Sequence, residues 1–595
     1  MEMFAFKTRS SKTLVLALWL SFAAGALAQG RYDPPYPRVA VQLFGRSEPE
    51  YYAQFDLIIL PRTNPLEVQA IKALNPDAIV LSTHVWTQKI RNFRMPDFKD
   101  EWLARDSKGN ILKPARGFPL INITNLCPRV NGKRYNEAMP DFLRDHVDLS
   151  VFDGIGTDWA WSAPHKVTDI DLDGNGKNDY QEYGKNWVNA KWVEGLESFI
   201  RRLRSNIGME PLLWVNSGGF HEWGIELTNG INLDHWPGFF SWRYFLQAYD
   251  NFMSKALKPH VFLLAARPYG GDPRKPDYTR DYLSFYRFML CGTLMGDGFF
   301  QGQPFEADEN KYIYYYDEYD VDLGYPTSEP QALSNGCYVR FFDKGLALLN
   351  PTGSPQRVRD SDLARLSGYA GPYYRFMGNQ DPLHNNGKRF DSIQLDGWTF
   401  PKGGKTFVMG DGIILVTEPR IVVADIFIDN LPHTTSPMTD AAKFKGAWTQ
   451  TVSGDDYYAS IALERKGWYA HAVIPGGDGS ATATFRPRLA VPGKYEIFEW
   501  HGQYPAPQAS NVPYIIDIGG NRREIIVDQT RNQGQWNSLG VYDLPQGTST
   551  AVIITNKANG YVIADAIKFV LQTGEQPSDA RAPQPPRNIR VRESN

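Results

Sequence analysis

The sequence contains little cysteine, no large excess of one charge and no long apolar run after its first 28 residues. Three cysteines in 595 residues exclude a dense disulfide framework. Lys and Arg number 63 and Asp and Glu number 66, so the formal net charge is −3, which argues against a dedicated nucleic-acid binder. A membrane span needs about 20 consecutive apolar residues. We therefore expect no span in the mature protein.

Aromatic residues, in contrast, are abundant, with 33 Phe, 31 Tyr and 16 Trp. Together with a hydrophobic content of 42%, they exclude intrinsic disorder for most of the chain. At about 150 residues per domain the length corresponds to roughly four domains, or fewer if one of them is a barrel. The composition therefore indicates a folded protein of several domains.

The N-terminus has the features of a secretory signal. Three basic residues precede a mostly apolar stretch at residues 13–27, and a small-residue cleavage site ends at Ala28. This pattern predicts a signal peptide at residues 1–28 and a mature protein that is secreted or periplasmic. An uncleaved membrane anchor is the alternative, which the shortness of the apolar stretch disfavours.

Short apolar runs alternate with amphipathic stretches over the first half of the chain. The runs that we predict to be strands are Val39–Phe44, Leu57–Leu60, Ala78–Ser82, Gly154–Asp158, Leu212–Asn216, Gly230–Asp234, Val261–Ala265 and Asp297–Phe300. Helical stretches such as Trp187–Leu203, Trp242–Ala256 and Asp281–Leu290 lie between them. Eight strands that alternate with helices predict a (β/α)8 TIM barrel over residues 36–336. A doubly wound open sheet is the alternative, but no glycine-rich phosphate loop follows the first strand.

The second half of the chain has the pattern of all-β units. Short strands broken by Gly, Pro and Asn predict a β-domain at residues 337–419. Residues 420–450 are predicted to be a linker, and residues 451–572 a β-sandwich. Residues 573–595 are rich in Pro, Arg and Ser, which predicts a disordered tail. The predicted fold class is therefore an α/β barrel followed by all-β modules.

Residues 171–182 match the calcium-loop pattern D-x-[DN]-x-[DN]-G-x5-E at every specified position. This pattern supplies oxygen ligands at alternate positions, a glycine at the sharp turn and a glutamate that closes the coordination shell. The predicted ligands are the side chains of Asp171, Asp173, Asn175, Asp179 and Glu182 and the backbone carbonyl of Lys177. We expect a structural Ca2+ ion there. The alternatives are an overlapping frame that begins at Asp169 and a polar surface turn that holds no ion.

Carboxylates at the ends of predicted strands are the candidates for catalysis, because a (β/α)8 barrel has its active site at the carboxyl ends of its strands. Asp158 ends the fourth predicted strand and Asp234 the sixth. Glycosidic hydrolysis uses one carboxyl group to protonate the leaving oxygen and another to attack or to activate water. We predict Asp158 as the nucleophile or electrostatic stabiliser and Asp234 as the general acid/base. A helix cap or a structural salt bridge is the alternative for either residue.

Aromatic and polar residues near the same strand ends are predicted to contact the substrate, since flat aromatic faces suit the apolar faces of sugar rings. They are His84, Trp86, Trp159, Trp161, Asn216, His235, Trp236, Arg267, Tyr269 and Glu318. Asp317, Glu318 and Asp320 are a rival source of the second carboxylate. Asp153, at the start of its strand, is predicted to be structural.

Four segments carry a resemblance to a known family of barrels. They are Phe55–Ile59, Asp153–Asp158, Tyr316–Gly324 and Gly345–Thr352. Through them the stretch Tyr51–Thr352 resembles the (β/α)8 glycoside hydrolases known as hypothetical glycosyl hydrolase family 15. The resemblance implies a barrel with a glycosidase-type site, and it matches Asp158 to the family-like aspartate after a D-G-I motif. Related barrels often place a glutamate near the sixth strand, where this chain has Asp234.

The third block carries a more specific resemblance. Its matching segments are Gly493–Glu496, Tyr504–Ala506, Asn511–Tyr514, Val527–Gln529, Gly534–Gly540 and Ala564–Ile567. Residues 451–571 thereby look like the golvesin C-terminal-like domain, which is also found as the carbohydrate-binding domain of xanthan lyases. The resemblance implies an accessory module that holds an enzyme on a polysaccharide. We interpret Trp536 as a core residue rather than a stacking residue.

These observations favour a secreted glycoside hydrolase that cleaves a polysaccharide by a two-carboxylate mechanism. A non-catalytic polysaccharide-binding protein on a degenerate barrel is the second hypothesis, because a fold does not determine a function. A polysaccharide lyase with a Tyr or His base is the third. The expected partner is a polysaccharide or oligosaccharide, without nucleic acid, and the sequence leaves the oligomeric state open.

Overall fold

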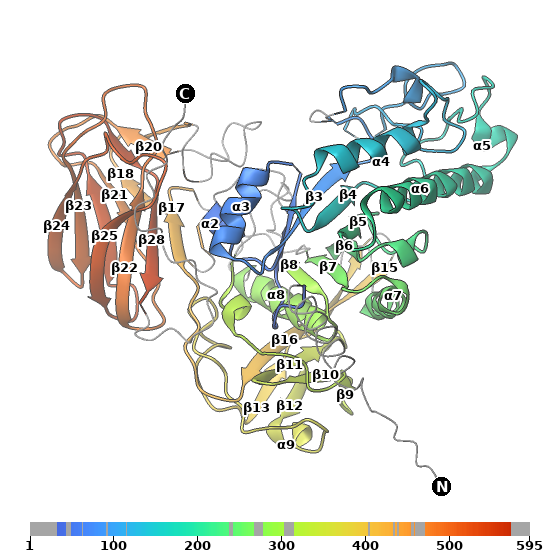
Figure 1. Ribbon diagram of the computed structural model, residues 1–595. Helices are drawn as coiled ribbons and strands as arrows, with labels where there is room; N and C mark the ends of the chain where they lie inside the picture. The colour runs from blue at the N-terminus through green and yellow to red at the C-terminus, as the bar shows by residue number, and fades with distance from the viewer. Residues whose placement is uncertain are drawn as a thin grey trace, which may run out of the picture.

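The computed structural model describes residues 32–42, 49–61, 63–90, 93, 95–114, 116–236, 242–266, 278–302, 315–402, 405–431, 435–436, 439–453, 457 and 471–572. The predicted signal peptide and the predicted tail lie outside these residues. Within them the chain forms a barrel, a small β module and a β-sandwich, at the centre, bottom and left of Figure 1. A search of the described helices finds none that is long and apolar enough to cross a membrane.

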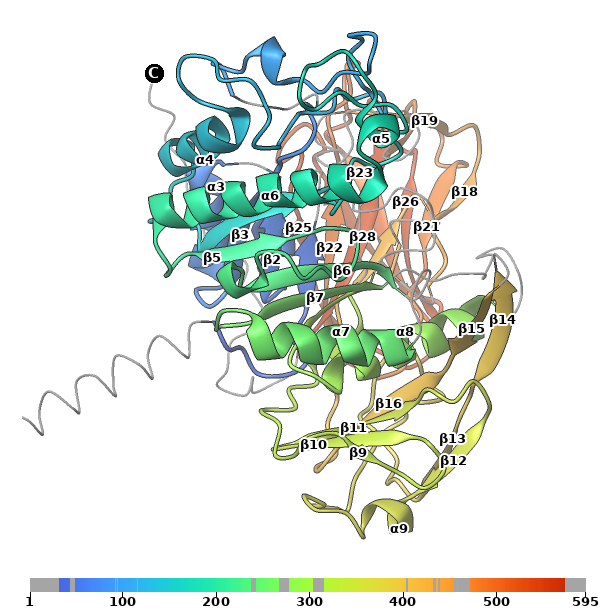
Figure 2. The same cartoon turned by 90° about the vertical axis from the view of Figure 1, so that its right-hand side faces the viewer.

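Eight parallel strands form the barrel sheet, in the order in which they occur along the chain (Figure 2). They are β1 (Ala40–Gln42), β2 (Leu57–Leu60), β3 (Ile79–Val85), β4 (Gly154–Asp158), β5 (Leu212–Val215), β6 (Gly230–Trp236), β7 (Val261–Ala266) and β8 (Phe299–Gly302). An isolated parallel bridge between Val39 and Phe300 joins β8 to the start of β1 and closes the ring. The predicted (β/α)8 fold and its eight strands are confirmed.

Helices of unequal length connect these strands. The longer ones are α3 (Pro65–Leu74), α4 (Tyr135–His146), α6 (Lys185–Ile207), α7 (Trp242–Lys255) and α8 (Tyr278–Leu294). The short ones are α2 (Pro49–Tyr52), α5 (Asp179–Glu182) and the 3-10 helices η1 (Asp100–Trp102), η2 (Ile225–Leu227) and η3 (Asp317–Asp320). The described chain after β8 has only η3 before the β module, where a regular barrel would have an α-helix.

Both faces of the barrel sheet are buried, so its strands are apolar on both sides. Side chains of the inner face form one cluster, which includes Leu81 of β3, Trp214 of β5 and Phe299 of β8. The Trp214 indole occupies space that glycines leave on the two neighbouring strands. A Cβ would lie 2.9 Å from this ring at Gly156 and 2.6 Å from it at Gly230. The three cysteines of the chain are all buried as free thiols.

The β module follows the barrel. Its elements are β9 (Gln331–Ala332), β10 (Tyr338–Phe342), β11 (Gly345–Asn350), β12 (Gln356–Arg359), α9 (Asp360–Leu363), β13 (Ser392–Leu395), β14 (Trp398–Lys402), β15 (Lys405–Met409) and β16 (Asp411–Val416). β16, β11, β10 and β9 form one sheet, which packs against α8. A Cβ at Gly412 of β16 would lie 2.7 Å from the Cys291 sulfur of α8, so this close approach requires glycine.

The C-terminal strands form a sandwich of two main sheets. Their bounds are β17 (Ile426–Asp429), β18 (Lys443–Lys445), β19 (Thr449–Thr451), β20 (His471–Ile474), β21 (Thr482–Phe485), β22 (Gly493–Trp500), β23 (Val512–Ile518), β24 (Asn521–Val527), β25 (Asn537–Leu544), β26 (Thr550–Thr555), β27 (Val562–Ala564) and β28 (Ala566–Leu571). One sheet has the order β17-β28-β22-β25 and the other β18-β21-β26-β23-β24. Phe485, Ile497, Ile516 and Phe569 meet in the core between them.

The predicted linker at residues 420–450 is wrong, because β17 and β18 from this stretch are edge strands of the two main sheets. β17 pairs with β28, far along the chain, and buries Ile426 and Ile428 in the sandwich core. The sandwich therefore begins with β17, at residue 426. Pairing over such a sequence distance leaves no local signal in the sequence.

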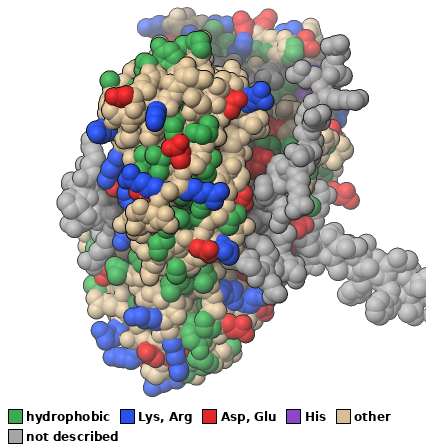
Figure 3. All heavy atoms as spheres, turned by 90° about the vertical axis from the view of Figure 1, so that its left-hand side faces the viewer, with side chains coloured by type: hydrophobic (Ala, Val, Ile, Leu, Met, Phe, Trp, Pro, Cys, Tyr) green, Lys and Arg blue, Asp and Glu red, His purple; other side chains and the backbone are tan. Residues whose placement is uncertain are grey.

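The outward face of the sandwich carries charges on its exposed edge strand. In the view of Figure 3, Lys and Arg side chains form a band across the middle of the face, and apolar side chains are spread in small patches. β24, at the edge of its sheet, contributes the exposed residues Arg522, Arg523 and Glu524. Charged side chains on an edge strand oppose edge-to-edge pairing with another molecule.

Candidate active site

Asp158 is the last residue of β4, and its side chain is buried at the carboxyl end of the barrel. The strand registers pair Thr157 of β4 with Val215 of β5, and Val215 with Ile231 of β6. The residues that follow these three are Asp158, Asn216 and Asn232. Asp158, Asn216 and Asn232 therefore form one row across β4, β5 and β6, which we call the polar row. Parallel strands lie about 4.8 Å apart, so neighbouring members of the row are within reach of one another.

Two N–H groups donate to the same oxygen of Asp158. The Asn216 amide Nδ2 lies 2.8 Å from Asp158 Oδ1, and the backbone nitrogen of Trp159 lies 3.0 Å from it. The Asn216 amide is fixed in turn, because its Oδ1 accepts the Gly218 N–H at 2.9 Å. N–H donors of this kind favour the ionised form of a carboxyl group. The arrangement therefore suits a carboxylate that acts as a nucleophile or as an electrostatic stabiliser.

Asn232 is a member of the polar row that the sequence analysis missed. Its side chain is fully buried, and neither its amide nitrogen nor its oxygen has a hydrogen-bond partner in the described part of the chain. A buried polar group without a partner is costly and calls for an explanation such as a bound ligand. The signal was present in the sequence, because Asn232 lies two positions before Asp234 and period-two alternation assigns both positions to one strand face.

Trp159 directly after Asp158 has a left-handed backbone, with a φ of 58°. This conformation is common for glycine but rare for a bulky residue. Such backbone strain is concentrated at functional sites. The Thr87 hydroxyl donates to the Trp159 carbonyl at 2.7 Å and helps to hold the strained peptide. The turn brings the chain from the strand end of Asp158 directly into a group of aromatic residues.

These aromatic residues form a half-buried platform beside Asp158. The rings of Trp159 and Trp161 are stacked, with centroids 5.7 Å apart and an interplanar angle of 13°, and His165 stacks on Trp161 at 4.0 Å. From the β3–α4 connection, Phe118 approaches Trp159 to 6.3 Å and the Arg116 guanidinium lies 5.8 Å from its ring centroid. We call the four rings, together with the exposed Arg116, the aromatic platform. Such flat faces next to a carboxylate suit the binding of sugar rings.

His84 and Trp86 do not lie on the inner face of β3. Ile79 and Leu81 belong to the inner cluster and Val80 to the outer one, so alternation assigns the even-numbered positions to the outside of the barrel. Trp86 is fully buried and stacks on Phe199 of α6 at 4.3 Å. Burial lowers the pKa of His84 to about 4. The predicted substrate contacts of these two residues are corrected to packing positions between the sheet and the helices.

Glu318 lies in the interface between the barrel and the β module. It is buried in η3 and accepts a 2.7 Å hydrogen bond from the Asn385 side chain of the module. Asp317 accepts backbone N–H groups of Asn379, Gln380 and Ala424 at 2.6–2.9 Å. The predicted substrate contact of Glu318, and the Asp317–Glu318 pair as a rival catalytic source, are therefore corrected to structural roles.

This interface contains more buried acids than buried cations. Arg287 of α8 forms ion pairs with Asp381 and with Asp411. Burial, reinforced by the charge of Glu318, raises the pKa of Asp317 to about 7. Burial also raises the pKa of Glu318. The imidazole of half-buried His384 lies 3.3 Å from Asp381. One guanidinium and this imidazole thus serve four buried carboxyl groups, which favours the retention of a proton in the group.

Asp153 has the structural role that the sequence predicted for it. At the start of β4, its Oδ2 accepts the Val80 N–H at 2.8 Å and forms an ion pair with Lys72 of α3 at 2.7 Å. The carboxylate therefore joins β3, β4 and α3 at the end of the barrel opposite to Asp158.

The remaining predicted substrate contacts and the predicted acid/base fall outside what the structure describes. Asp234, His235 and Trp236 belong to β6, but their side chains are not described. Arg267 and Tyr269 lie in the segment 267–277, outside the described residues. The pairing of Asp158 with Asp234 therefore stays a prediction.

The predicted metal ligands lie on the connection between β4 and α6. Ligand oxygens of Asp171, Asp173 and Asp179 all lie within 4.8 Å of one another. The Glu182 carboxylate adjoins this group, since its Oε2 accepts the Asn175 amide at 2.9 Å. Asp169, the start of the alternative frame, accepts the backbone N–H and the hydroxyl of Ser107 instead. The loop frame that begins at Asp171 is thus the one that gathers its carboxylates.

Comparison with known proteins gives one family match, in the sandwich. Residues 434–571 match the model of the Golvesin C-terminal domain. The chain is also 32% identical over 158 residues to a xanthan lyase from Bacillus sp. (strain GL1), which covers 26% of this chain and only 15% of the length of the lyase.

The solved structures that match this chain include three that are 10–19% identical to it. Paenibacillus xanthan lyase is 19% identical, covering 45% of this chain and 28% of the lyase at a TM-score of 0.21. Aspergillus fumigatus Ega3, solved with galactosamine, is 12% identical over 48% of this chain and 96% of its own, at a TM-score of 0.29. The glycoside hydrolase domain of PelA from Pseudomonas aeruginosa is 10% identical over 46% and 96%, at a TM-score of 0.27.

The fold and the site define a class of protein. It is a (β/α)8 barrel with a carboxylate–amide row and an aromatic platform at the carboxyl ends of its strands, joined through a β module to a β-sandwich. The sandwich is the part of the chain whose sequence matches the Golvesin C-terminal domain.

Proposed function

We propose that the protein is a glycoside hydrolase that acts on a polysaccharide at the carboxyl end of its barrel. The observation that carries this proposal is the polar row of Asp158, Asn216 and Asn232 beside the aromatic platform. The platform offers a stacking surface for a sugar ring, and the row offers a carboxylate and amides to its polar groups. The match of residues 434–571 to the Golvesin C-terminal domain and the 32% identity over 158 residues to a xanthan lyase add support.

In the proposed mechanism Asp158 acts in its ionised form. The Asn216 and Trp159 N–H groups hold its carboxylate at the strand end, from where it would approach the anomeric carbon or stabilise positive charge there. Asp234 of β6 is proposed as the general acid that protonates the leaving oxygen. Asn232 would hydrogen-bond a sugar hydroxyl, which would give its buried amide the partner that it lacks.

We also propose that the protein is exported, on the strength of the basic and apolar N-terminal stretch and the small-residue site that ends at Ala28. An extracellular or periplasmic location gives an enzyme access to polymers that do not enter the cell. Mass spectrometry of the protein secreted by an expression host would test this, with Gln29 expected as the first residue.

A panel of polysaccharides, assayed for released reducing ends, tests the barrel proposal. Asp158→Asn keeps the shape of the side chain but removes its charge, so we expect turnover to fall by a factor of about 10³ or more while substrate still binds. Asp145→Asn, on the exposed surface of α4, is the matched control and should keep full activity. Near-full turnover by Asp158→Asn would refute the assignment.

A polysaccharide lyase is the second candidate, and His165 is the observation that favours it. Burial lowers the pKa of this imidazole, so that the ring on the aromatic platform is neutral at pH 7 and can accept a proton. A lyase product carries an unsaturated sugar at its new end, which absorbs ultraviolet light, whereas a hydrolysis product does not. The same polysaccharide panel therefore separates the two reactions.

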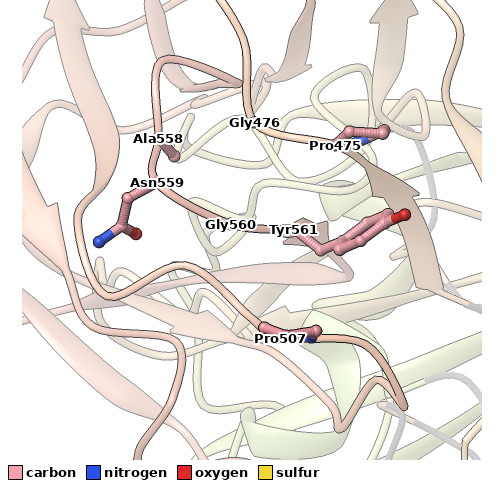
Figure 4. A pocket seen from close by; sticks show the side chains of 7 residues that line it. All are labelled: Pro475, Gly476, Pro507, Ala558, Asn559, Gly560 and Tyr561. Carbon is pink, nitrogen blue, oxygen red and sulfur yellow. The ribbon is translucent and has the colours of Figure 1, made fainter.

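For the sandwich we propose a role in holding the enzyme on its polymer. A surface hollow of about 340 Å³ lies between three of its loops and is lined by Pro475, Pro507, Asn559 and Tyr561. In Figure 4 the Tyr561 ring lies between the two prolines. The half-buried Tyr504 adjoins it, with ring centroids 5.0 Å apart. A shallow hollow that is lined by a tyrosine ring suits a sugar unit of a long chain.

A further inference from the structure

The loop at residues 171–182 concentrates negative charge in a small volume. It contains four carboxylates, and oxygens of Asp171, Asp173 and Asp179 lie within 4.8 Å of one another. Like charges at this distance repel. Backbone N–H groups of Gly174, Asn175 and Gly176 donate to Asp171 and offset part of the repulsion, and a cation between the carboxylates would offset more. The cation that the loop itself supplies is the ammonium group of Lys177, which is exposed and contacts Glu182 rather than the three aspartates.

Asp179 gives an independent indication that a ligand belongs in this cluster. Its side chain is 0% exposed, and Oδ2 accepts the Leu172 N–H at 2.7 Å. Oδ1 has no hydrogen-bond partner in the described part of the chain, although it is buried beside Asp171 and Asp173. A buried carboxylate oxygen without a donor is rare in native proteins, and a bound cation is one partner that can satisfy it.

The donor set fits calcium better than the other common metals. All predicted ligands are oxygens, and they include side-chain carboxylates, the Asn175 amide oxygen and the Lys177 carbonyl. Zinc prefers nitrogen and sulfur ligands, and magnesium keeps most of its waters and few protein ligands. Calcium takes six to eight oxygen ligands in a flexible arrangement, as an exposed loop of this kind can supply.

We propose that residues 171–182 bind one Ca2+ ion, with Asp171, Asp173 and Asp179 as the central ligands, and that this ion fixes the aromatic platform. Asn175, Lys177 and Glu182 complete the ligand set. The binding of the ion does not depend on the proposed function. The inference that the ion matters for substrate binding through the platform rests on the proposed function.

The loop is physically connected to both sides of the platform. It lies on the same β4–α6 connection as Trp159 and Trp161. It also binds the β3–α4 connection, since Asp171 donates its N–H to the Arg105 carbonyl at 2.9 Å and Asn122 donates to the Leu172 carbonyl at 3.0 Å. That second connection carries Arg116 and Phe118. An ion at the loop therefore restrains both chain segments from which the platform is built.

Calorimetric titration of the chelator-treated full-length protein with CaCl2 tests the site directly. We expect one ion per chain and a rise in the melting temperature of about 5 °C or more in excess CaCl2. Asp173→Asn, on an exposed ligand, should weaken binding at least tenfold, and the surface variant Asp145→Asn should bind as the wild type does. The absence of binding heat and of a melting shift in the wild type would overturn the proposal.

Terbium luminescence keeps the test independent of any loss of stability in the variant. Tb3+ replaces Ca2+ on oxygen ligands and is excited by a nearby tyrosine, and the Tyr183 hydroxyl lies 3.3 Å from Asp173 Oδ2. We expect emission that CaCl2 displaces and that Asp173→Asn lacks. Equal emission from wild type and Asp173→Asn would refute the site. Hydrogen exchange should slow in peptides of residues 159–184 and 103–122 when Ca2+ is added, and unchanged exchange there would refute the link to the platform.

Discussion

Asn232 illustrates at the scale of one residue how a functional site differs from a packing site. The two neighbours of this residue on the outer face, Ile231 and Leu233, are fully buried in an apolar cluster. At position 232, on the inner face, a leucine would fill the same space and would not bury an unpaired polar group. An asparagine there is destabilising in the free protein, so a role in ligand binding explains its presence better than packing does.

Asn232→Leu should therefore separate stability from activity. Leucine is about the same size and removes the unsatisfied amide, so the free energy of unfolding should stay unchanged or rise by up to about 3 kcal/mol. The melting temperature should stay unchanged or rise accordingly. Loss of a hydrogen bond to the sugar should lower kcat/KM at least tenfold on the glycan that the panel identifies. Calorimetry and initial rates measure the two effects. A clear fall in melting temperature would instead indicate that the amide has a structural role.

Asp317 leads to a prediction about pH. Its pKa is raised to about 7 by burial and by Glu318, so between about pH 4 and pH 7 the folded protein holds a proton that the unfolded chain has released. Stability must then fall as pH rises through this window and level off above it, by a few kcal/mol at about 1.4 kcal/mol per pKa unit. The Asp317→Asn variant lacks this titration.

The difference in melting temperature between wild type and Asp317→Asn, measured from pH 5 to pH 8, isolates the effect. We expect the wild type to lose its advantage as pH rises. An advantage that is constant or grows with pH would mean that the three N–H donors keep Asp317 ionised throughout.

At the scale of elements, the barrel strands could be predicted from the sequence, whereas the faces of some strands could not. Both faces of a parallel strand are buried, so β3 shows no alternation of apolar and polar residues from which to assign His84 and Trp86 to a face. Asp158 was assigned correctly to a strand end because β4 is bounded by Asp153 and Trp159 in a clear local pattern. Glu318 was misassigned because its partner Asn385 is 67 residues away, in another unit.

β17 provides a prediction at this scale. A fragment of residues 421–572 contains the strand, whereas a fragment of residues 451–572 lacks it together with Ile426 and Ile428 of the core. Burial of each isoleucine contributes about 1.5–3 kcal/mol, which is a large share of the 5–15 kcal/mol that stabilises a typical domain. We expect a cooperative thermal transition by circular dichroism for the longer fragment alone. Equal melting temperatures for both fragments would contradict the assignment of β17 to the sandwich.

At the scale of the whole molecule, one chain of hydrogen bonds joins the three units. Asp317 of the barrel accepts the Asn379 N–H of the β module at 2.6 Å. The Asn379 side chain donates to the Arg488 carbonyl of the sandwich at 2.9 Å and accepts the Ala490 N–H at 2.5 Å. The sandwich is therefore docked on the module rather than attached by a flexible linker. Docking fixes the direction in which a bound polymer would leave the sandwich.

The last prediction follows from this arrangement. If the sandwich holds a polymer near the barrel, it raises the local substrate concentration without taking part in the chemistry. Truncation after residue 425 should then lower activity on the polymer at least tenfold and change kcat/KM on short oligosaccharides less than twofold. Tyr561→Ala, in the surface hollow, should reproduce the loss on polymer with the units still docked, whereas Tyr542→Ala, outside the hollow, should not. Equal losses on polymer and oligosaccharide after truncation would show that the sandwich supports the barrel structurally. An unchanged rate on polymer for Tyr561→Ala would exclude the hollow as the site of polymer contact.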